Sequence, residues 1–277
     1  MSNKTILILL DGCRYDAATD NLGYLEHLAE MGLASKFRVM GELPSLSRPM
    51  YETLMTGLPV YQHGITNNQI IRNSKQISLF DLCRENKLTT AAAAYHWISE
   101  LYVRAPFLPV TDRIQLDGSS KIQYGIYYFE DQYPNSHVYA DAEYLRQQFH
   151  PDFMLVHPMN IDDAGHKYGS NSTEYQQVVA MENILLSAIL PIWLEAGYQI
   201  MVTADHGMNE HHIHGGNTLL QREVPLYLIS DKIKKISRIE KHLSELFIAP
   251  MLCHLLGIDK SSGMRDLSEM EEDIFEA

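Results

Sequence analysis

Short apolar runs alternate with segments of helical periodicity along this chain, and this alternation limits its possible folds more than any other feature. Thr5–Leu10 is an apolar run that opens directly onto Asp11 and Gly12, as a buried strand of a parallel sheet does. Residues 22–31 then repeat apolar side chains at helical spacing and end at Gly32. Strands separated by helices predict an α/β fold, here a three-layer α/β/α sandwich around a mostly parallel central sheet.

The alternation continues through the rest of the chain. Further strands are predicted at 89–94, 153–157, 198–203 and 224–229, and helices at 79–86, 173–196 and about 239–256. Ser78 is a candidate N-cap, and Pro191 is expected to kink or divide the long helix. The buried stripe of that helix is predicted to be Tyr175, Val178, Glu182, Leu185, Ile189 and Ile192.

One irregular segment, residues 101–138, interrupts this pattern. It is rich in tyrosine, contains several prolines and is too long for a plain connection, so we expect a lid or small cap beside an active site. A peripheral hairpin whose aromatic side chains simply pack is the alternative. We predict a single domain over residues 1–277, with a polar surface tail after Lys260.

The net charge of −13, from 22 Lys and Arg against 35 Asp and Glu, excludes some functions. Sequence-independent binding of nucleic acid needs a basic surface, so a nucleic acid duplex is not an expected partner. An anionic substrate must instead meet a local positive centre. The apolar run Ile6–Leu10 is too short for a membrane span or a secretion signal, and three separated cysteines indicate reduced thiols. We therefore expect a cytoplasmic protein without a membrane partner, and the sequence leaves its oligomeric state open.

Aspartate and histidine residues cluster just after three of the predicted strands, at the edge where the carboxyl ends of parallel strands meet. The set comprises Asp11, Asp162, His166, Asp205, His206 and His214. Three carboxylates and three imidazoles form a ligand set for two divalent cations, and this mixture suits zinc, with manganese or iron as alternatives. His211 or His212 could replace His214, but only His214 is followed by glycines that permit close backbone approach.

Ser47 is the candidate nucleophile. It precedes a predicted helix at 50–55, and a hydroxyl at a helix N-terminus faces free backbone N–H groups that stabilise a phosphoryl group. An ordinary N-cap serine would look the same in the sequence. No base is adjacent to Ser47, so its activation requires a metal that lowers the pKa of the hydroxyl.

Together these segments resemble the alkaline phosphatase superfamily, and most of all its type I phosphodiesterase/nucleotide pyrophosphatase branch. The resemblance touches nearly the whole chain, at residues 8–12, 44–65, 162–169, 203–208, 214–215, 224–226 and 248–258. It implies an alkaline-phosphatase-like fold and two zinc ions. The implied ligands are Asp11, Asp205, His206 and the Ser47 oxygen for one zinc, and Asp162, His166 and His214 for the other.

The chain departs from the family pattern near the nucleophile. The family's phosphodiesterases usually have threonine at the position of Ser47 and, three residues later, an asparagine that donates to a phosphate oxygen; Met50 stands there and cannot donate. Arg48 is a candidate for the missing contact, and Met50 and Asn68 are also predicted to line the substrate site. The sulfatase branch is disfavoured, because its fixed arginine is replaced by Tyr51.

The predicted function is hydrolysis of a small phosphorylated substrate by a phosphodiesterase-like enzyme that forms a phosphoserine on Ser47. Phosphonates such as phosphonoacetate, and phosphomonoesters, are alternative substrates for the same centre. A phosphomutase of the same superfamily is a further alternative. A serine hydrolase without metal lacks its usual G-x-S-x-G turn here, and a non-catalytic metal-binding module would not need a placed nucleophile.

Overall fold

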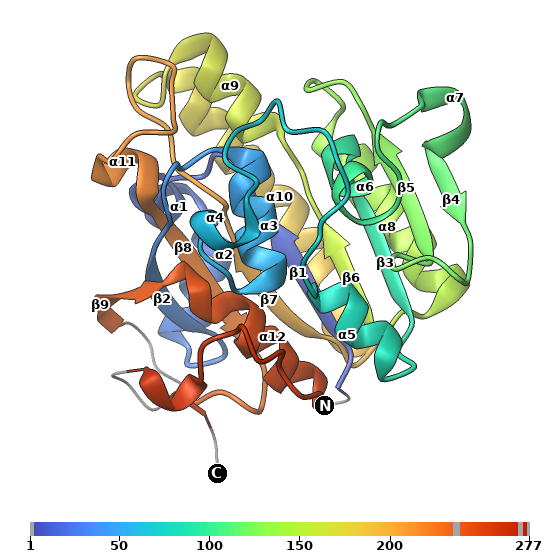
Figure 1. The fold of residues 1–277 in the computed structure, drawn as a ribbon. Coiled ribbons are helices and arrows are strands. Elements are labelled where there is room, and N and C mark those ends of the chain that lie inside the picture. The colour runs from blue at the N-terminus through green and yellow to red at the C-terminus, as the bar shows by residue number, and fades with distance from the viewer. Residues whose placement is uncertain (1–2, 235–238, 271–273, 276–277) are drawn as a thin grey trace.

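The computed structural model describes residues 3–234, 239–270 and 274–275, which form an α/β/α sandwich around one sheet (Figure 1). Within these residues the strands are β1 (Thr5–Leu9), β2 (Ser35–Met40), β3 (Thr90–Tyr95), β4 (Ile114–Leu116), β5 (Tyr124–Tyr128), β6 (Phe153–Val156), β7 (Gln199–Thr203), β8 (Glu223–Ile229) and β9 (Ile239–Ser244). Their order across the sheet is β4-β5-β3-β6-β1-β7-β8-β2-β9.

The helices form a layer on each face of this sheet. They are α1 (Tyr15–Asn21), α2 (Gly23–Glu30), α3 (Ser47–Thr56), α4 (Val60–His63), α5 (Leu79–Glu85), α6 (His96–Tyr102), α7 (Pro109–Asp112), α8 (Asn135–Phe149), α9 (Asn160–Tyr168), α10 (Thr173–Glu195), α11 (Leu219–Arg222) and α12 (Ile248–Leu256), with short 3-10 turns η1 (Glu245–Phe247) and η2 (Leu267–Glu269). In Figure 1, α3, α5 and α12 lie on the near face, and α1, α2 and α10 lie on the far face.

The centre of the sheet is parallel, as predicted. Strands β5, β3, β6, β1 and β7 run in one direction, and β1, β3, β6 and β7 are buried along their whole length. Helix layers on both faces explain why these strands are continuous apolar runs. The mostly parallel α/β sandwich is therefore confirmed, although β4 and β8 are antiparallel to their neighbours.

The far edge of the sheet differs from the prediction. The segment at 239–256, predicted as one helix, begins with strand β9, and only Ile248–Leu256 forms the helix α12. Strand β9 pairs in parallel with β2, a strand that the sequence pattern did not indicate. The local pattern of residues 239–244 predicted a helix, but pairing with the distant strand β2 makes this segment a strand. Such pairing cannot be read from the segment's own sequence.

The long helix α10 is continuous from Thr173 to Glu195 and contains Pro191, so the expected division does not occur. Its buried side chains are Tyr175, Val179, Glu182, Leu186, Leu190 and Trp193. This stripe follows the helical repeat of 3.6 residues more closely than the predicted one, which drifts around the helix and ends on the exposed Ile192. Among the described helices, α10 alone is long and apolar enough to cross a membrane by length and composition.

The irregular segment at 101–138 supplies the other edge of the sheet. It contains α7, β4 and β5, and Tyr127 and Tyr128 of β5 are buried. These two tyrosines pack in the core, as the hairpin alternative expects, and are not part of an exposed lid. Beyond Lys260 the chain is not entirely a polar surface tail, because Met264 and Ile274 are buried.

The buried carboxyl of Glu182 leads to a test of stability. Burial raises its pKa to about 7, although it accepts hydrogen bonds from Asn135 and Tyr139. The folded protein thus holds this proton more tightly than the unfolded chain, so stability is lost as the pH rises from the ordinary pKa of 4.5 to about 7. The change that Glu182→Gln makes in the free energy of unfolding is expected to be about 2 kcal/mol more favourable at pH 8 than at pH 5. In thermal melts this corresponds to about 5 °C in melting temperature. Equal effects at the two pH values would contradict a buried charge at this position.

Candidate metal centre

Three aspartates meet where the carboxyl ends of β1, β6 and β7 lie side by side. Asp11 follows β1, Asp205 follows β7, and Asp162 lies in the first turn of α9, shortly after β6. Strand β1 pairs with β6 on one side and with β7 on the other, which is why residues so far apart in the sequence converge. All three side chains are buried.

Asp11, Asp205 and His206 form the first group of possible metal ligands. Their ligand atoms lie within 4.8 Å of one another. The Nε2 atom of His206 is 3.2 Å from Asp205 Oδ2 and 3.5 Å from Asp11 Oδ1. The sequence predicted these three residues for one metal position, and the structure brings them together.

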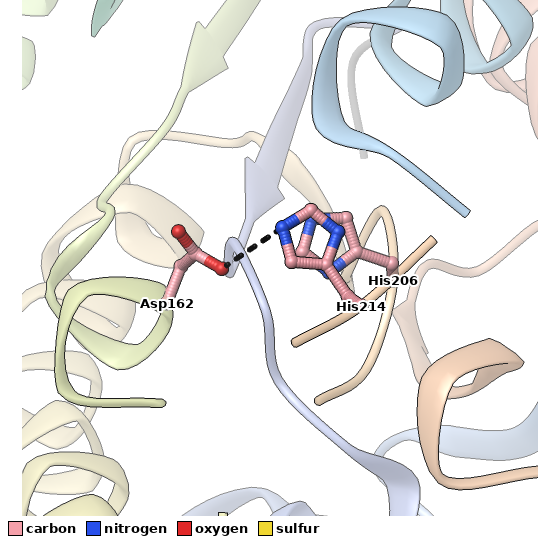
Figure 2. Close-up of side chains that lie close together, drawn as sticks. All are labelled: Asp162, His206 and His214. Atoms are coloured by element: carbon pink, nitrogen blue, oxygen red, sulfur yellow. Dashed lines mark ion pairs between the residues drawn. The ribbon is translucent and has the colours of Figure 1, made fainter. Parts of the chain in front are cut away.

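Asp162, His206 and His214 form the second group, which Figure 2 shows. His214 Nε2 lies 3.8 Å from Asp162 Oδ1, and the rings of His206 and His214 are stacked with centroids 3.7 Å apart. His166 is at the outer side of this group, 45% exposed, with its Nε2 3.4 Å from Asp162 Oδ2. His206 therefore belongs to both groups, whereas His166, which the sequence assigned to the second metal position, is in neither group among the described residues.

The backbone fixes the tautomers of the three histidines. Each Nδ1 lies 2.9 Å from a backbone carbonyl oxygen, and because a carbonyl only accepts, each Nδ1 carries the proton. The carbonyls belong to His212 for His166, to Gly207 for His206 and to Ser45 for His214. Each Nε2 is left with a lone pair, the form in which imidazole binds a metal.

The carboxylates have oxygen atoms that the protein does not satisfy. Asp11 Oδ1, Asp162 Oδ1 and Asp205 Oδ2 are buried and have no hydrogen-bond partner. Burial and the charge of Asp11 raise the pKa of Asp162 and of Asp205 well above the usual value. Buried oxygens that face one another without donors are costly unless cations lie between them, so this donor set fits two divalent metals.

Burial also keeps His206 and His214 neutral. It lowers the pKa of His206, and it lowers the pKa of His214 to about 3. Neutral imidazoles do not compensate the negative charge of the aspartates that they face. Compensation of that charge requires a cation.

Ser47 lies at the first position of α3, beside the first group. Its Oγ is 3.0 Å from His206 Nε2, so the hydroxyl donates to the lone pair of that nitrogen. A serine–histidine–aspartate triad would place the aspartate on the other ring nitrogen. Here the serine and both carboxylates approach the same Nε2, as ligands around one cation do, which argues against the serine hydrolase without metal.

Glycines allow the segments of the centre to approach closely. Gly12 has φ +73°, and a Cβ there would lie 2.8 Å from the Cα of Asp162. Gly215 has φ +96°, and a Cβ there would lie 2.8 Å from the side chain of Leu46, which precedes the nucleophile. The glycine after His214 thus has the close approach predicted from the sequence. His211 and His212 are exposed, and neither belongs to the two ligand groups among the described residues.

Residues 5–259 match the type I phosphodiesterase / nucleotide pyrophosphatase family. The chain belongs to this family. Members act on phosphoesters, and the two ligand groups agree with the family's dependence on metal; the identity of the ion is not fixed by the donors.

Relatives of this family member include proteins named as GPI ethanolamine phosphate transferases. Human GPI ethanolamine phosphate transferase 2, catalytic subunit, is 24% identical over 271 residues, which are 92% of this chain and 26% of that protein. The chain thus spans about a quarter of the length of the curated relatives it matches.

Solved structures place this phosphodiesterase family member among alkaline-phosphatase-like folds. Murine ectonucleotide pyrophosphatase / phosphodiesterase 5 superposes with a TM-score of 0.74 at 12% identity, covering 98% of this chain and 100% of that one. Phosphonoacetate hydrolase from Sinorhizobium meliloti, solved with phosphonoacetate, has a TM-score of 0.53 at 20% identity, covering 74% and 56% of the two chains.

The three predicted substrate contacts lie next to the nucleophile. Arg48 is buried; its Nη2 is 2.8 Å from Glu100 Oε2 and its Nε donates to the Asn68 carbonyl, so the protein itself neutralises this guanidinium. Met50 is also buried and offers no donor. The Asn68 side-chain oxygen accepts from the Arg48 backbone N–H at 3.1 Å. Because Arg48 directly follows Ser47, this bond holds Asn68 near the nucleophile. Their roles in substrate binding stay predictions.

Two further residues of this family member contact the centre and were missed by the sequence analysis. His157 and Tyr51 both donate hydrogen bonds to Asp11 Oδ2. His157 directly follows β6, so it also lies at the edge where the carboxyl ends of the parallel strands meet, which is the signal that identified the aspartates. Tyr51 lies one helical turn after Ser47, on the same face of α3.

Proposed function

We propose that this protein is a two-metal phosphoester hydrolase of the phosphodiesterase type, with Ser47 as the nucleophile. The observation that supports this most is the convergence of the Ser47 hydroxyl and two buried carboxylates on the single Nε2 of His206. Neither a triad nor a simple ion pair uses that arrangement. The proposed substrate is a small phosphorylated molecule, and the cytoplasmic location stays a prediction.

The residues divide into two proposed metal positions. Asp11, Asp205, His206 and Ser47 would hold one ion, and Asp162, His166 and His214 would hold the other. Zinc is the proposed ion and manganese the alternative, because imidazole and carboxylate donors suit both. When bound, two such cations stabilise charge on the phosphoryl oxygens and lower the pKa of the serine hydroxyl and of water.

The chain's own residues then perform the two steps of the reaction. Ser47 Oγ attacks phosphorus and releases its proton to solvent. The bond from phosphorus to the leaving oxygen breaks with its electron pair, that oxygen takes up a proton from solvent, and a phosphoserine forms. The free backbone N–H groups at the start of α3 face the phosphoryl oxygens. Water afterwards breaks the bond between phosphorus and Ser47 Oγ, which releases the phosphorylated product and restores the serine.

A second candidate is transfer of the phosphoryl-bearing group from Ser47 to an alcohol in place of water. Its support is the similarity, along 92% of this chain, to a protein named as an ethanolamine phosphate transferase. The same first step serves both activities, and only the acceptor differs. A phosphomutase is a special case in which the acceptor is a sugar. A phosphonate substrate has weaker support, from the fold of phosphonoacetate hydrolase.

A substrate panel tests this proposal. The chain, loaded with Zn²⁺ or Mn²⁺, would be assayed on an aryl phosphodiester, an aryl phosphomonoester, phosphonoacetate and glycerophosphoethanolamine, with and without a glycerol acceptor. We expect the diester to be cleaved fastest, with loss of activity in chelator. A glycerol adduct as the main product from the aryl phosphodiester would favour the transferase. No turnover of any phosphorus substrate with either metal would contradict the proposal.

A further inference from the structure

The two oxygens of the Asp11 carboxylate have different surroundings. Oδ2 accepts hydrogen bonds from the Tyr51 hydroxyl and from His157 Nε2, the latter at 2.9 Å. Oδ1 is buried without a hydrogen-bond partner and lies 3.5 Å from His206 Nε2. One oxygen is therefore held by the protein while the other faces the first group of ligands.

His157 has the opposite tautomer from His206 and His214, the histidines of the ligand groups, and from His166 beside them. Its Nδ1 accepts from the backbone N–H of Tyr95 at 3.4 Å, so the proton lies on Nε2. That Nε2–H points at Asp11 Oδ2 and is unavailable as a lone pair. His157 is thus a donor to a ligand, whereas His166, His206 and His214 present their lone pairs.

The surrounding strands fix His157 in place. Its backbone N–H donates to Ala93 in β3 at 2.9 Å, and its carbonyl accepts from the Tyr128 hydroxyl in β5 at 2.6 Å. Its side chain is completely buried. The backbone of His157 is therefore held by two neighbouring strands, and turning its ring would break the hydrogen bonds that its two nitrogens make with Tyr95 and Asp11.

Tyr51 couples this arrangement to the nucleophile. Its ring packs edge-on against the His157 ring, with centroids 4.8 Å apart and planes at 73°. Burial raises the pKa of its hydroxyl well above the usual value, so Tyr51 stays a neutral donor. Because Tyr51 and Ser47 share α3, the bond to Asp11 also fixes the nucleophile's helix relative to that carboxylate.

We propose that His157 and Tyr51 are positioning residues that hold Asp11 Oδ2 and so direct Asp11 Oδ1 at the first metal position. The proposal rests on the proposed function, because it assumes that Asp11 binds a metal. Residues that hydrogen-bond to metal ligands typically contribute ten- to a hundredfold to metal affinity. We expect His157 and Tyr51 to raise the affinity of the metal position at Asp11 and to leave the affinity of the position at Asp162 unchanged.

Zinc affinity, measured by competition with a chromophoric chelator, tests the proposal. His157→Leu is expected to lower the affinity for one of two bound zinc ions by about 10- to 100-fold and to leave the affinity for the other unchanged. His157→Gln, whose amide nitrogen can still donate to Asp11, is expected to recover part of the loss. Tyr51→Phe removes only a hydroxyl and should also weaken one ion; it decides the question if His157→Leu does not fold.

Tyr139→Phe is the matched control, since it removes a buried hydroxyl that donates to a different buried carboxylate, Glu182. It should lower thermal stability without changing either zinc affinity. Unchanged affinities in both His157→Leu and Tyr51→Phe, with two ions bound to the wild type, would overturn this inference and leave the proposed function intact. A wild type that binds no zinc or manganese would overturn both.

Discussion

Replacing Ser47 by alanine is expected to abolish turnover while both metal positions still fill. The substitution removes the oxygen that attacks phosphorus, and loss of a nucleophile typically costs about 10⁴-fold or more in kcat. The buried carboxylates and the three histidines are unchanged, so most of the metal affinity should persist. Elemental analysis of the purified variant and its kcat on the best diester check both halves. The wild type, quenched during turnover, should also yield a phosphorylated peptide that contains Ser47.

Ser45→Ala is a matched control for this substitution. Ser45 lies two residues away on the same loop, and its hydroxyl donates to the Gly216 carbonyl at 2.9 Å, away from His206. Its own carbonyl, which accepts from His214, is kept in the variant. We expect Ser45→Ala to retain most of the activity. A Ser47→Ala enzyme with comparable activity would show that the reaction has no covalent step at this serine.

Asp205→Asn is expected to lose metal and activity together and yet to stabilise the metal-free protein. Burial and the neighbouring Asp11 raise the pKa of Asp205, so the metal-free fold loses stability as the pH rises above the usual aspartate range. Asparagine removes that loss, and its oxygen can still accept from the Gly12 N–H. At pH 8 in chelator, the variant should therefore melt above the wild type.

Metal should reverse that order. Binding at about 1,000 times Kd stabilises a protein by about 4 kcal/mol per site, which is about 10 °C here. We expect this increase in the wild type and a much smaller one in Asp205→Asn. Calorimetry with and without zinc gives both values. Equal zinc-induced shifts in the two proteins would mean that Asp205 is not a ligand.

Two adjacent aspartates of α9 give a matched pair for the second metal position. Asp162 is buried and faces His214, whereas Asp163 is paired with Lys167 at 2.7 Å. Asp162→Asn should lose one metal ion, and Asp163→Asn should behave like the wild type. Similar metal loss in both variants would point to a general effect on α9 and not to coordination.

Much of the centre could be predicted because its residues obey a local rule. Asp11, Asp162 and Asp205 each follow an apolar strand, and parallel strands bring such positions to one edge wherever they occur in the sequence. The same rule covered His157, but the sequence does not show which tautomer a histidine adopts. That depends on the Tyr95 N–H, contributed by a neighbouring strand.

The edges of the sheet could not be predicted in the same way. Strand β2 and its partner β9 lie about 200 residues apart, and β9 was taken for the start of a helix. In α10 the repeat was recognised, but the choice between Leu185 and Leu186 as the buried residue depends on how the helix lies on the sheet. Arg48 similarly appeared available for substrate because its partner Glu100 lies in a different helix.

The sequence by itself determined the parallel core, the six candidate ligands and the serine, since buried strands must be apolar and polar groups can gather only where those strands end. Tertiary structure alone decided which nitrogen each histidine presents, which carboxylate oxygens stay unpaired, and that Arg48 is neutralised by Glu100. These properties depend on hydrogen bonds between distant segments, and a hydrogen bond exists only when the fold brings its donor within about 3.5 Å of its acceptor.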